Sequence, residues 1–265
     1  MKRLSNLMLL FVALVVSQSA MAWGGWGHHI SAYIAEKHLT PEAKAKCEYY
    51  LKHKLPHYSS WQDHWRHSDP FKEISYWHSS YVNKQFDVIG YKGDETRDAA
   101  YQVNRITKEM EKGKYNSMSD SLVAVNLKLL IHMVGDMHCP SHVVYTKDFG
   151  LNGYSINVKG KKVGRHKFWD SAPQLMHPRW KADRFIKAYD TYSPKEIKKI
   201  SKGNAFKWSV QNAHNIMKTS DYWERGAEFT KFSKEERQQI EETLHEQLAF
   251  AGYRLAATLN KIFSK

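Results

Sequence analysis

The stretch that decides the fold class is "LLIHMVGDMHCPSHV", residues 129–143, an apolar helical segment that carries three histidines, one aspartate and one cysteine. Burying an imidazole or a carboxylate costs free energy unless the group is hydrogen-bonded, ion-paired or coordinated to metal. His132 and Asp136 stand four residues apart, which puts both on one face of a helix. His138 and His142 repeat the spacing. The segment therefore predicts a buried polar site whose other members come from elsewhere in the chain.

The rest of the chain also has mainly helical periodicity. Thr40 and Pro41 are typical of an N-cap and a first helical residue, and Pro140 should end or kink its helix before His142. The alternating segment "GYSINVKGKKVG" (153–164) predicts a hairpin-like insertion. With no internal repeat or linker, we expect a single, mostly helical, all-α domain. The expected helices cover roughly 28–39, 41–54, 94–112, 119–138, 164–174, 182–188, 194–218 and 234–262.

The first 22 residues are typical of a secretory signal peptide, with a basic start, a short apolar run and the small-residue ending Ala20-Met21-Ala22. The apolar run is short for a membrane anchor. We therefore expect cleavage after Ala22, a mature domain over 23–265 that begins at Trp23, and a secreted or periplasmic location without a stable membrane anchor.

Composition sets weaker limits. Removing the signal segment would lower the formal charge from +13 to +11, which favours an acidic partner only weakly, because surface lysines also serve solubility. The chain has only two cysteines, Cys47 and Cys139, which excludes a fold held together by several disulfides. The sequence does not decide whether these two form one disulfide. The apolar fraction of 42% suffices for one core.

Three further clusters offer partners for the opening segment. In "GRHKFWD" (164–170), His166 and Asp170 repeat the four-residue spacing; Asp63 and His78 follow aromatic residues; and His28 lies near the new amino terminus. Imidazole and carboxylate with almost no thiolate is the ligand mixture of catalytic zinc, which activates water for hydrolysis. One such histidine would more often be a satisfied core imidazole, but four segments together favour a metal site.

These motifs, with "SWQD" (60–63), "WH" (77–78) and "DFGLN" (148–152), resemble the trinuclear-zinc, single-strand-preferring nucleases/3′-nucleotidases of fungi, plants and bacteria. The resemblance covers nearly the whole mature chain. It implies the helical fold shared with zinc-dependent phospholipase C, three Zn²⁺ ions, and single-stranded nucleic acid and 3′-nucleotides as substrates. It assigns one zinc to Asp63, His78, His132 and Asp136, a second to His142, His166 and Asp170, and a third to Asp136, His28 and the α-amino nitrogen and carbonyl oxygen of Trp23.

The resemblance also implies a mechanism. A hydroxide held between the two zincs that Asp136 bridges would attack phosphorus, and the zinc of the His142 group would stabilise the departing 3′ oxygen. Asp63, through its zinc, and Arg66, by neutralising phosphate oxygens, are the catalytic candidates; a surface ion pair is the alternative for Arg66. His138, Trp61 and Trp77 match family positions too and are expected to be supporting or packing residues.

Substrate contacts match less well. Asn152 is a candidate base contact, beside Leu151 where the family has glycine. Ser79 and Tyr81 stand where the family has a stacking aromatic residue and a base-binding carboxylate, so we expect altered base preference.

Three functions therefore remain open. The first is a nuclease/3′-nucleotidase that acts on RNA, single-stranded DNA and 3′-nucleotides, releases 5′-phosphate products and is expected to be monomeric. The second is a phospholipase C, disfavoured by the Trp23 to His28 spacing and by Asp170 in place of glutamate. The third is a non-catalytic exported protein that binds zinc or nucleic acid, which Arg66 beside an open metal cluster argues against.

Overall fold

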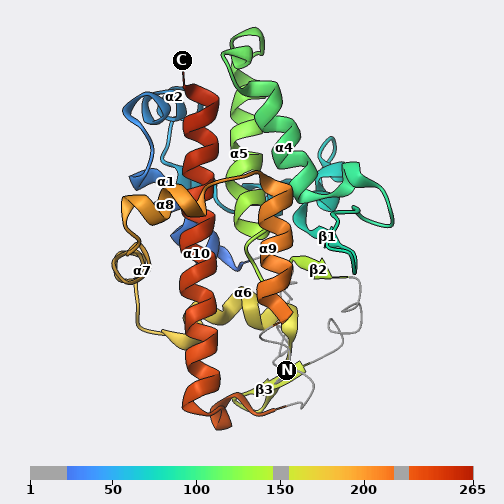
Figure 1. Ribbon diagram of the computed structural model, residues 1–265, viewed down its shortest axis with the longest axis vertical. Coiled ribbons are helices and arrows are strands. Elements are labelled where there is room, and N and C mark those ends of the chain that lie inside the picture. Colours follow the sequence, from blue (N-terminus) through green and yellow to red (C-terminus); the bar gives the residue numbers. More distant parts are fainter. Residues whose placement is uncertain (1–22, 146–154, 218–226, 265) are drawn as a thin grey trace, which may run out of the picture.

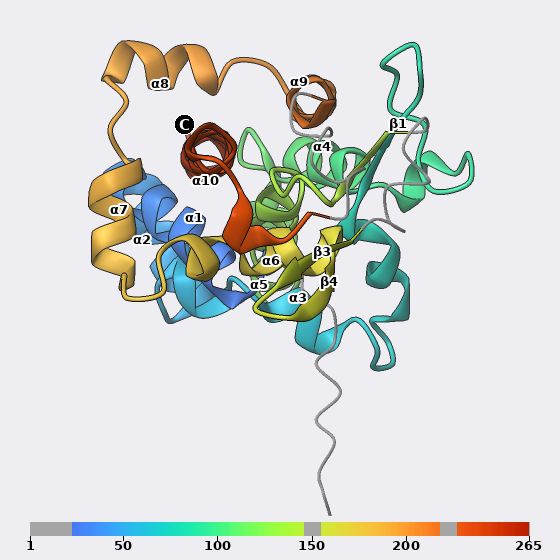
Figure 2. The same ribbon diagram turned by 90° about the horizontal axis from the view of Figure 1, so that it is seen from below.

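A computed structural model describes residues 23–145, 155–217 and 227–264, and these residues form a mostly helical domain. The long helix α10 (Lys234–Phe263) runs along most of the molecule and packs closely against α1 (Gly25–Lys37) and against α5 (Asp120–Asp136) (Figure 1). Viewed from below, α1 and α7 lie on one side of α10 and α9 on the other (Figure 2). The remaining α-helices are α2 (Pro41–Leu51), α3 (Trp61–Trp65), α4 (Ala99–Met110), α6 (Arg165–Met176), α7 (Ala182–Tyr189), α8 (Pro194–Ile200) and α9 (Ala205–Met217).

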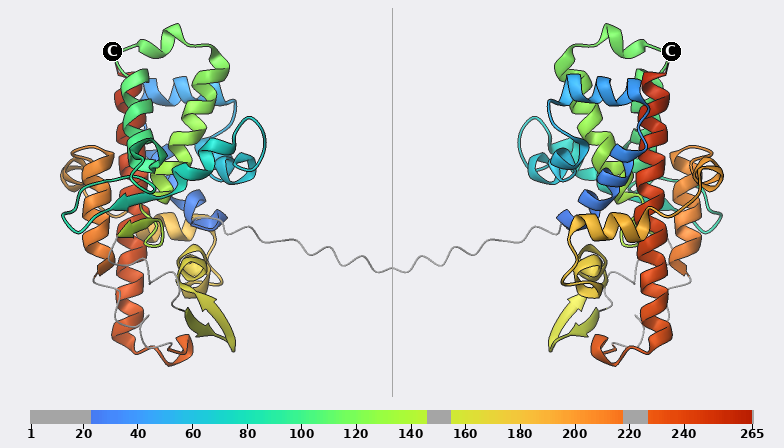
Figure 3. Two further views of the ribbon diagram at one scale, coloured as in Figure 1. Left: turned by 90° about the vertical axis from the view of Figure 1, so that its right-hand side faces the viewer. Right: turned by 90° about the vertical axis from the view of Figure 1, so that its left-hand side faces the viewer.

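Short elements connect these helices. Strand β1 (Ser80–Val82) pairs in parallel with β2 (Val143–Tyr145), and β3 (Ser155–Val158) pairs antiparallel with β4 (Lys161–Gly164). The β3–β4 pair is the expected hairpin and lies near the lower end of the molecule (Figure 3). Its turn residues Lys159 and Gly160 have φ of 50° and 74°, as a type I′ turn requires. The 3₁₀ helices are η1 (Leu55–Tyr58), η2 (Lys72–His78), η3 (Glu95–Arg97), η4 (Lys114–Ser117) and η7 (Phe229–Lys231).

The all-α prediction is confirmed, but some helix bounds were wrong. The stretch 194–218 holds two helices, because Gly203 has a φ of 114° and Asn204 accepts a hydrogen bond from the Lys207 N–H, so that a new helix begins. The helix expected over 94–112 begins only at Ala99, because Asp98 caps it. Thr40 caps α2 as expected, and that helix ends at Leu51 rather than at residue 54.

The core has two halves, and α10 contributes to both. Its C-terminal part packs with α2, α4 and α5, and its N-terminal part packs with α6 and α7. A Cβ at Gly252 would lie 2.6 Å from the Ile34 Cβ, so glycine is what lets α10 approach α1 this closely. Cys47 and Cys139 are buried and unpaired by a disulfide.

The described helices include none both long and apolar enough to cross a membrane. The proposed signal segment 1–22, including Ala22, after which we expect cleavage, lies outside the described residues.

Candidate functional site

Three histidines from three elements converge on the carboxylate of Asp136. His28 Nε2 on α1 lies 3.1 Å from Asp136 Oδ1, and His78 Nδ1, at the end of η2, lies 2.9 Å from Oδ2. His132 Nε2, one turn earlier on α5, lies 3.2 Å from Oδ2. Asp63 on α3 completes the group, with Oδ1 3.8 Å from both His78 Nδ1 and His132 Nε2. All five side chains are buried, so the four-residue spacing on α5 does face a polar site.

Local structure explains how His28 and His132 are placed. A Cβ on Gly135 would lie 2.6 Å from His28 Nδ1, so glycine in the last turn of α5 makes room for the imidazole. His132 Nδ1 donates to the Ser59 carbonyl at 2.7 Å, which turns Nε2 toward the carboxylates.

A second group lies where α5 has ended. His142 Nε2 is 2.7 Å from His166 Nε2, and His166 lies on the same face of α6 as Asp170, 3.9 Å away. His142 Nδ1 donates to the His78 carbonyl at 2.7 Å, and the Ser80 N–H donates to the His142 carbonyl at 2.9 Å. The β1–β2 pairing therefore holds the two groups next to each other.

Cys139 lies in this second group, although sequence reasoning did not place it there. Its sulfur, a nitrogen of His142 and an oxygen of Asp170 lie within 4.8 Å of one another. Burial raises the pKa of the Cys139 thiol far above its usual value, so at neutral pH it is a thiol rather than the thiolate that binds metal. The Cys139-x2-His142 spacing could have placed Cys139 in this group from the sequence. Because its thiol is protonated at neutral pH, Cys139 is a weaker metal ligand than His142 or His166.

The donor set suits a cation. Buried atoms without a hydrogen-bond partner include both carboxylate oxygens of Asp63 and of Asp170, both ring nitrogens of His28, and His78 Nε2. Such atoms are rare in folded proteins and call for an ion or a water. Burial lowers the pKa of His78 and of His142 to about 4, which keeps both imidazoles in the neutral form that binds metal.

Charge within the cluster points the same way. Burial disfavours a charged His132, but the carboxylates of Asp136 and Asp63 outweigh it and raise the pKa of His132 to about 9. Burial also disfavours a charged Asp136, yet His132 and then His142 hold its pKa well below the usual value. Burial and the charge of Asp136 raise the pKa of Asp170 to about 8. The carboxylates thus create a potential that favours positive charge at this point.

The cluster opens to solvent on the side of Arg66 and His166. The His166 side chain is 36% exposed and that of Arg66 14%, whereas Asp63, Asp136 and His132 are exposed by 2% or less. Arg66 Nη1 lies 3.6 Å from Asp63 Oδ1. A substrate would therefore meet a guanidinium and an imidazole at the mouth of the cluster, with carboxylates behind them.

Trp23 lies beside the second group. Its side chain is fully buried, and its backbone forms a hydrogen bond with the Cys139 thiol. The next residue, Gly24, passes so close to α6 that a Cβ there would lie 2.6 Å from the Asp170 carbonyl oxygen. The structure thus brings the Trp23 backbone close to Cys139 and Asp170. The role of Trp23 as a ligand of a third zinc, with His28 and Asp136, stays a prediction.

The other described residues that were selected from the sequence do not join the cluster. His138 faces away from the cluster, since Nδ1 donates to the Val134 carbonyl and Nε2 accepts from Arg254. The buried Arg254 was not anticipated, because a single arginine in the amphipathic helix α10 carries no motif. Tyr81 packs its ring 5.5 Å from that of Tyr91. Asn152 lies outside the described residues.

Comparison with known proteins places this site in a family. The family described as S1/P1 nuclease matches residues 23–264. Nuclease S1 of Aspergillus oryzae is 24% identical over an alignment of 286 positions, which covers 95% of this chain and 96% of that protein. Endonuclease 2 of Arabidopsis thaliana is 28% identical over 165 aligned positions, which cover 56% of this chain and 55% of that protein. Nuclease P1 of Penicillium citrinum is 25% identical over 160 aligned positions, which cover 56% of this chain and 57% of that protein. With the metal-binding cluster and the helical fold, these matches show that the chain belongs to the S1/P1 nuclease family.

Proposed function

We propose that this nuclease is a zinc-dependent endonuclease with 3′-nucleotidase activity, which hydrolyses RNA and single-stranded DNA to 5′-phosphate products and hydrolyses 3′-nucleotides to nucleosides and inorganic phosphate. The observation that carries the proposal is the convergence of His28, His78 and His132 on Asp136, at 2.9–3.2 Å, next to Arg66 at the mouth of the cluster. Imidazole nitrogens with carboxylate oxygens are the ligands of zinc in hydrolytic sites.

The residues fit three zinc ions. When bound, zinc makes a water nucleophilic near neutral pH and stabilises negative charge on phosphate and leaving oxygens. The carboxylate oxygens of Asp63 and Asp170, His28 Nδ1 and His78 Nε2 have no hydrogen-bond partner, which supports this assignment. One zinc would be held by Asp63, His78, His132 and Asp136, a second by His142, His166 and Asp170, and a third by Asp136, His28 and the backbone amine and carbonyl of Trp23.

The chain's own groups would bind and orient the phosphate. Arg66 would donate to the non-bridging oxygens, where negative charge grows during attack, and charge-assisted hydrogen bonds of this kind are strong in a partly buried site. The Asp63 carboxylate, 3.6 Å from the Arg66 Nη1, would hold the guanidinium in place as well as binding metal. The Ser59 and His78 carbonyls fix the tautomers of His132 and His142, so that each ring presents its Nε2 to the site.

We also propose export and processing. The family match begins at residue 23, which supports a mature domain that starts at Trp23 after cleavage behind Ala22. A secreted or periplasmic location and a monomeric state belong to the same proposal. A free α-amine can bind zinc, whereas an amide nitrogen cannot without losing its proton, so cleavage would complete the site.

One panel of substrates tests the function. Purified mature protein would be incubated with denatured DNA, RNA, 3′-AMP and phosphatidylcholine, with and without a chelator. We expect hydrolysis of the first three, with 5′-phosphate ends on the products of DNA and RNA and with adenosine and inorganic phosphate from 3′-AMP. The chelator should abolish hydrolysis. Hydrolysis of phosphatidylcholine alone would instead establish a phospholipase C, and chelator-insensitive binding without turnover would establish a non-catalytic binding protein.

A further inference from the structure

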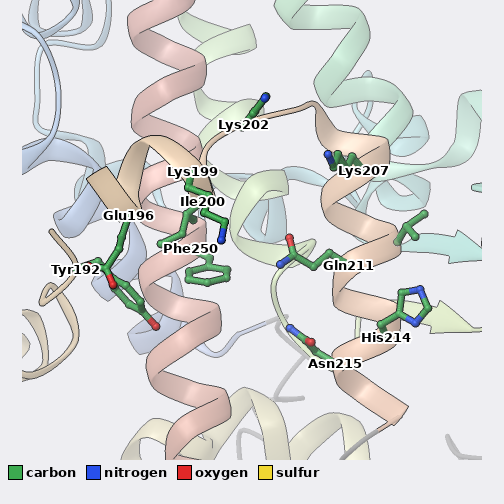
Figure 4. Close-up of a pocket in the computed structure, with 11 residues that line it drawn as sticks. Tyr192, Glu196, Lys199, Ile200, Lys202, Lys207, Gln211, His214, Asn215 and Phe250 are labelled. Atoms are coloured by element: carbon green, nitrogen blue, oxygen red, sulfur yellow. The ribbon is translucent and has the colours of Figure 1, made fainter. Parts of the chain in front are cut away.

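A separate cavity of about 760 Å³ lies between α10 and the α8–α9 pair, and none of the residues of the metal-binding cluster lines it. Its volume is typical of sites for small organic ligands. Figure 4 shows Phe250 extending from α10 toward the cavity, and Gln211 and Asn215 extending from α9 toward α10. The lining residues are Tyr192, Glu196, Lys199, Ile200, Lys202, Lys207, Val210, Gln211, His214, Asn215 and Phe250.

One wall is aromatic. Phe250 and Tyr192 lie with ring centroids 5.6 Å apart at 61°, and Ile200 adds apolar surface. The Arg254 guanidinium lies 5.1 Å from the Phe250 centroid, which fixes the ring from behind. A flat ring can stack on Phe250 from the cavity side.

The opposite wall offers a donor and an acceptor one helical turn apart. Gln211 Oε1 accepts from Arg254 Nη2, which leaves the Gln211 amide N–H groups as donors. Asn215 Nδ2 donates to Glu246 Oε1 at 2.6 Å, which leaves the Asn215 oxygen as an acceptor. Paired amide donors and acceptors are suited to the edge of a nucleobase.

The charge around the cavity is positive. Among the described residues, Lys199, Lys202 and Lys207 line it with the carboxylate of Glu196, and a second carboxylate, that of Glu246, is hydrogen-bonded to the lining residue Asn215. Arg254 is buried and donates hydrogen bonds to three uncharged groups, the Ile200 carbonyl, Gln211 and His138. The lysines that line the cavity thus favour an anion over a cation.

We infer that this cavity binds a nucleotide unit, with the base stacked on Phe250, the base edge on Gln211 and Asn215, and the phosphate at Lys199. The inference rests on the proposed function for the source of the ligand, which is either a free nucleotide or one residue of a bound single strand. Aromatic stacking, an amide pair and lysines within one cavity match the face of a base, the edge of a base and a phosphate.

The test compares two charge reversals on α8 in the mature zinc-loaded protein. Lys199→Glu changes the cavity, whereas Lys198→Glu, one residue earlier, changes a lysine that lines a different hollow beside Tyr253. By titration calorimetry with 5′-AMP, we expect Lys199→Glu to weaken one class of sites at least tenfold and Lys198→Glu to stay within twofold of the parent. Phe250→Leu should weaken the same class, and adenosine or inorganic phosphate alone should bind more weakly than 5′-AMP. Equal 5′-AMP binding by the parent, Lys199→Glu and Phe250→Leu would overturn the inference.

Two further readouts identify the source and separate this inference from the proposed function. If strands supply the ligand, Lys199→Glu raises the ratio of the KM for denatured DNA to the KM for a dinucleotide; if free nucleotides do, the ratio stays constant. Lys199-dependent 5′-AMP binding by a protein that hydrolyses no nucleic acid would overturn the proposed function and keep the cavity assignment. Hydrolysis without such binding would overturn the cavity assignment alone.

Discussion

The Gly135→Ala variant tests whether displacing the His28 imidazole abolishes zinc binding and activity while the domain, including α5, stays folded. The added Cβ would lie 2.6 Å from His28 Nδ1, and ordinary contact begins at 3.4 Å, so the imidazole must move by about 0.8 Å. Metal–ligand bonds tolerate only about 0.2 Å. His28 therefore cannot keep both its place beside Asp136 and a bond to zinc.

The magnitudes separate stability from function. Alanine gains about 1 kcal/mol of helix propensity over glycine, and overpacking costs about 1–3 kcal/mol, so the net loss is at most about 2 kcal/mol. In a domain of this size that lowers Tm by about 4–8 °C at most. A misplacement near 1 Å at a catalytic centre costs about a hundredfold in rate. We expect a folded protein that has lost one zinc and about 99% of its activity.

The assays are zinc content by mass spectrometry, thermal melting by circular dichroism, and hydrolysis of denatured DNA. Gly25→Ala is the matched control, because it lies on the same helix as His28 and its Cβ would meet Ser60 Oγ at an ordinary 3.8 Å. Gly135→Ala protein with the zinc content and rates of the control would refute the placement of His28 as a ligand.

Three other perturbations follow from the structure. Burial raises the pKa of Asp190, but hydrogen bonds from Lys37, His38 and Tyr253 outweigh burial and depress the pKa, so this carboxylate stabilises the fold above its unfolded pKa of 3.8 and loses that effect in acid. Asp190→Asn should therefore lower Tm at pH 7, and the Tm difference from the parent should narrow as the pH falls below about 4. A Tm difference that is constant from pH 7 to pH 3 would contradict this. Ser79 and Tyr81 supply neither a stacking ring at the first position nor a carboxylate at the second, so specificity constants for the four 3′-ribonucleotides should differ little, and a strong single-base preference abolished by changing Asn152 alone would count against it. Protein that retains a methionine before Trp23 should fold, bind about two zincs and be strongly impaired, and equal zinc content and rates for extended and processed protein would rule this out.

Periodicity was enough to predict most of the helices, because their apolar faces recur at helical spacing and their caps are local. Thr40 caps its helix and the segment around Lys159-Gly160 forms a hairpin, both as predicted. The break in 194–218 was missed, although Gly203 followed by Asn204 is a local signal for one helix ending and another beginning. The β1–β2 pair was missed as well, because it joins segments more than 60 residues apart and is only three residues long.

The histidines and aspartates of the site could be selected from sequence because paired spacing on α5 and α6 shows which residues share a face. What positions them could not be predicted in this way. The Ser59 carbonyl, the Gly135 contact with His28 and the Arg254 hydrogen bond to His138 depend on close approach between distant segments, and none of these residue types is distinctive by itself.

The central claim, that metal held around Asp136 performs nucleic-acid hydrolysis, is tested most directly by measuring zinc per chain and denatured-DNA hydrolysis for the mature protein and for Asp136→Ala. We expect about three zincs and chelator-sensitive hydrolysis for the parent, and the loss of at least one zinc and nearly all turnover for the variant, because this carboxylate would serve two metals. An Asp136→Ala protein with the parent's zinc content and near-parental rates would contradict the claim.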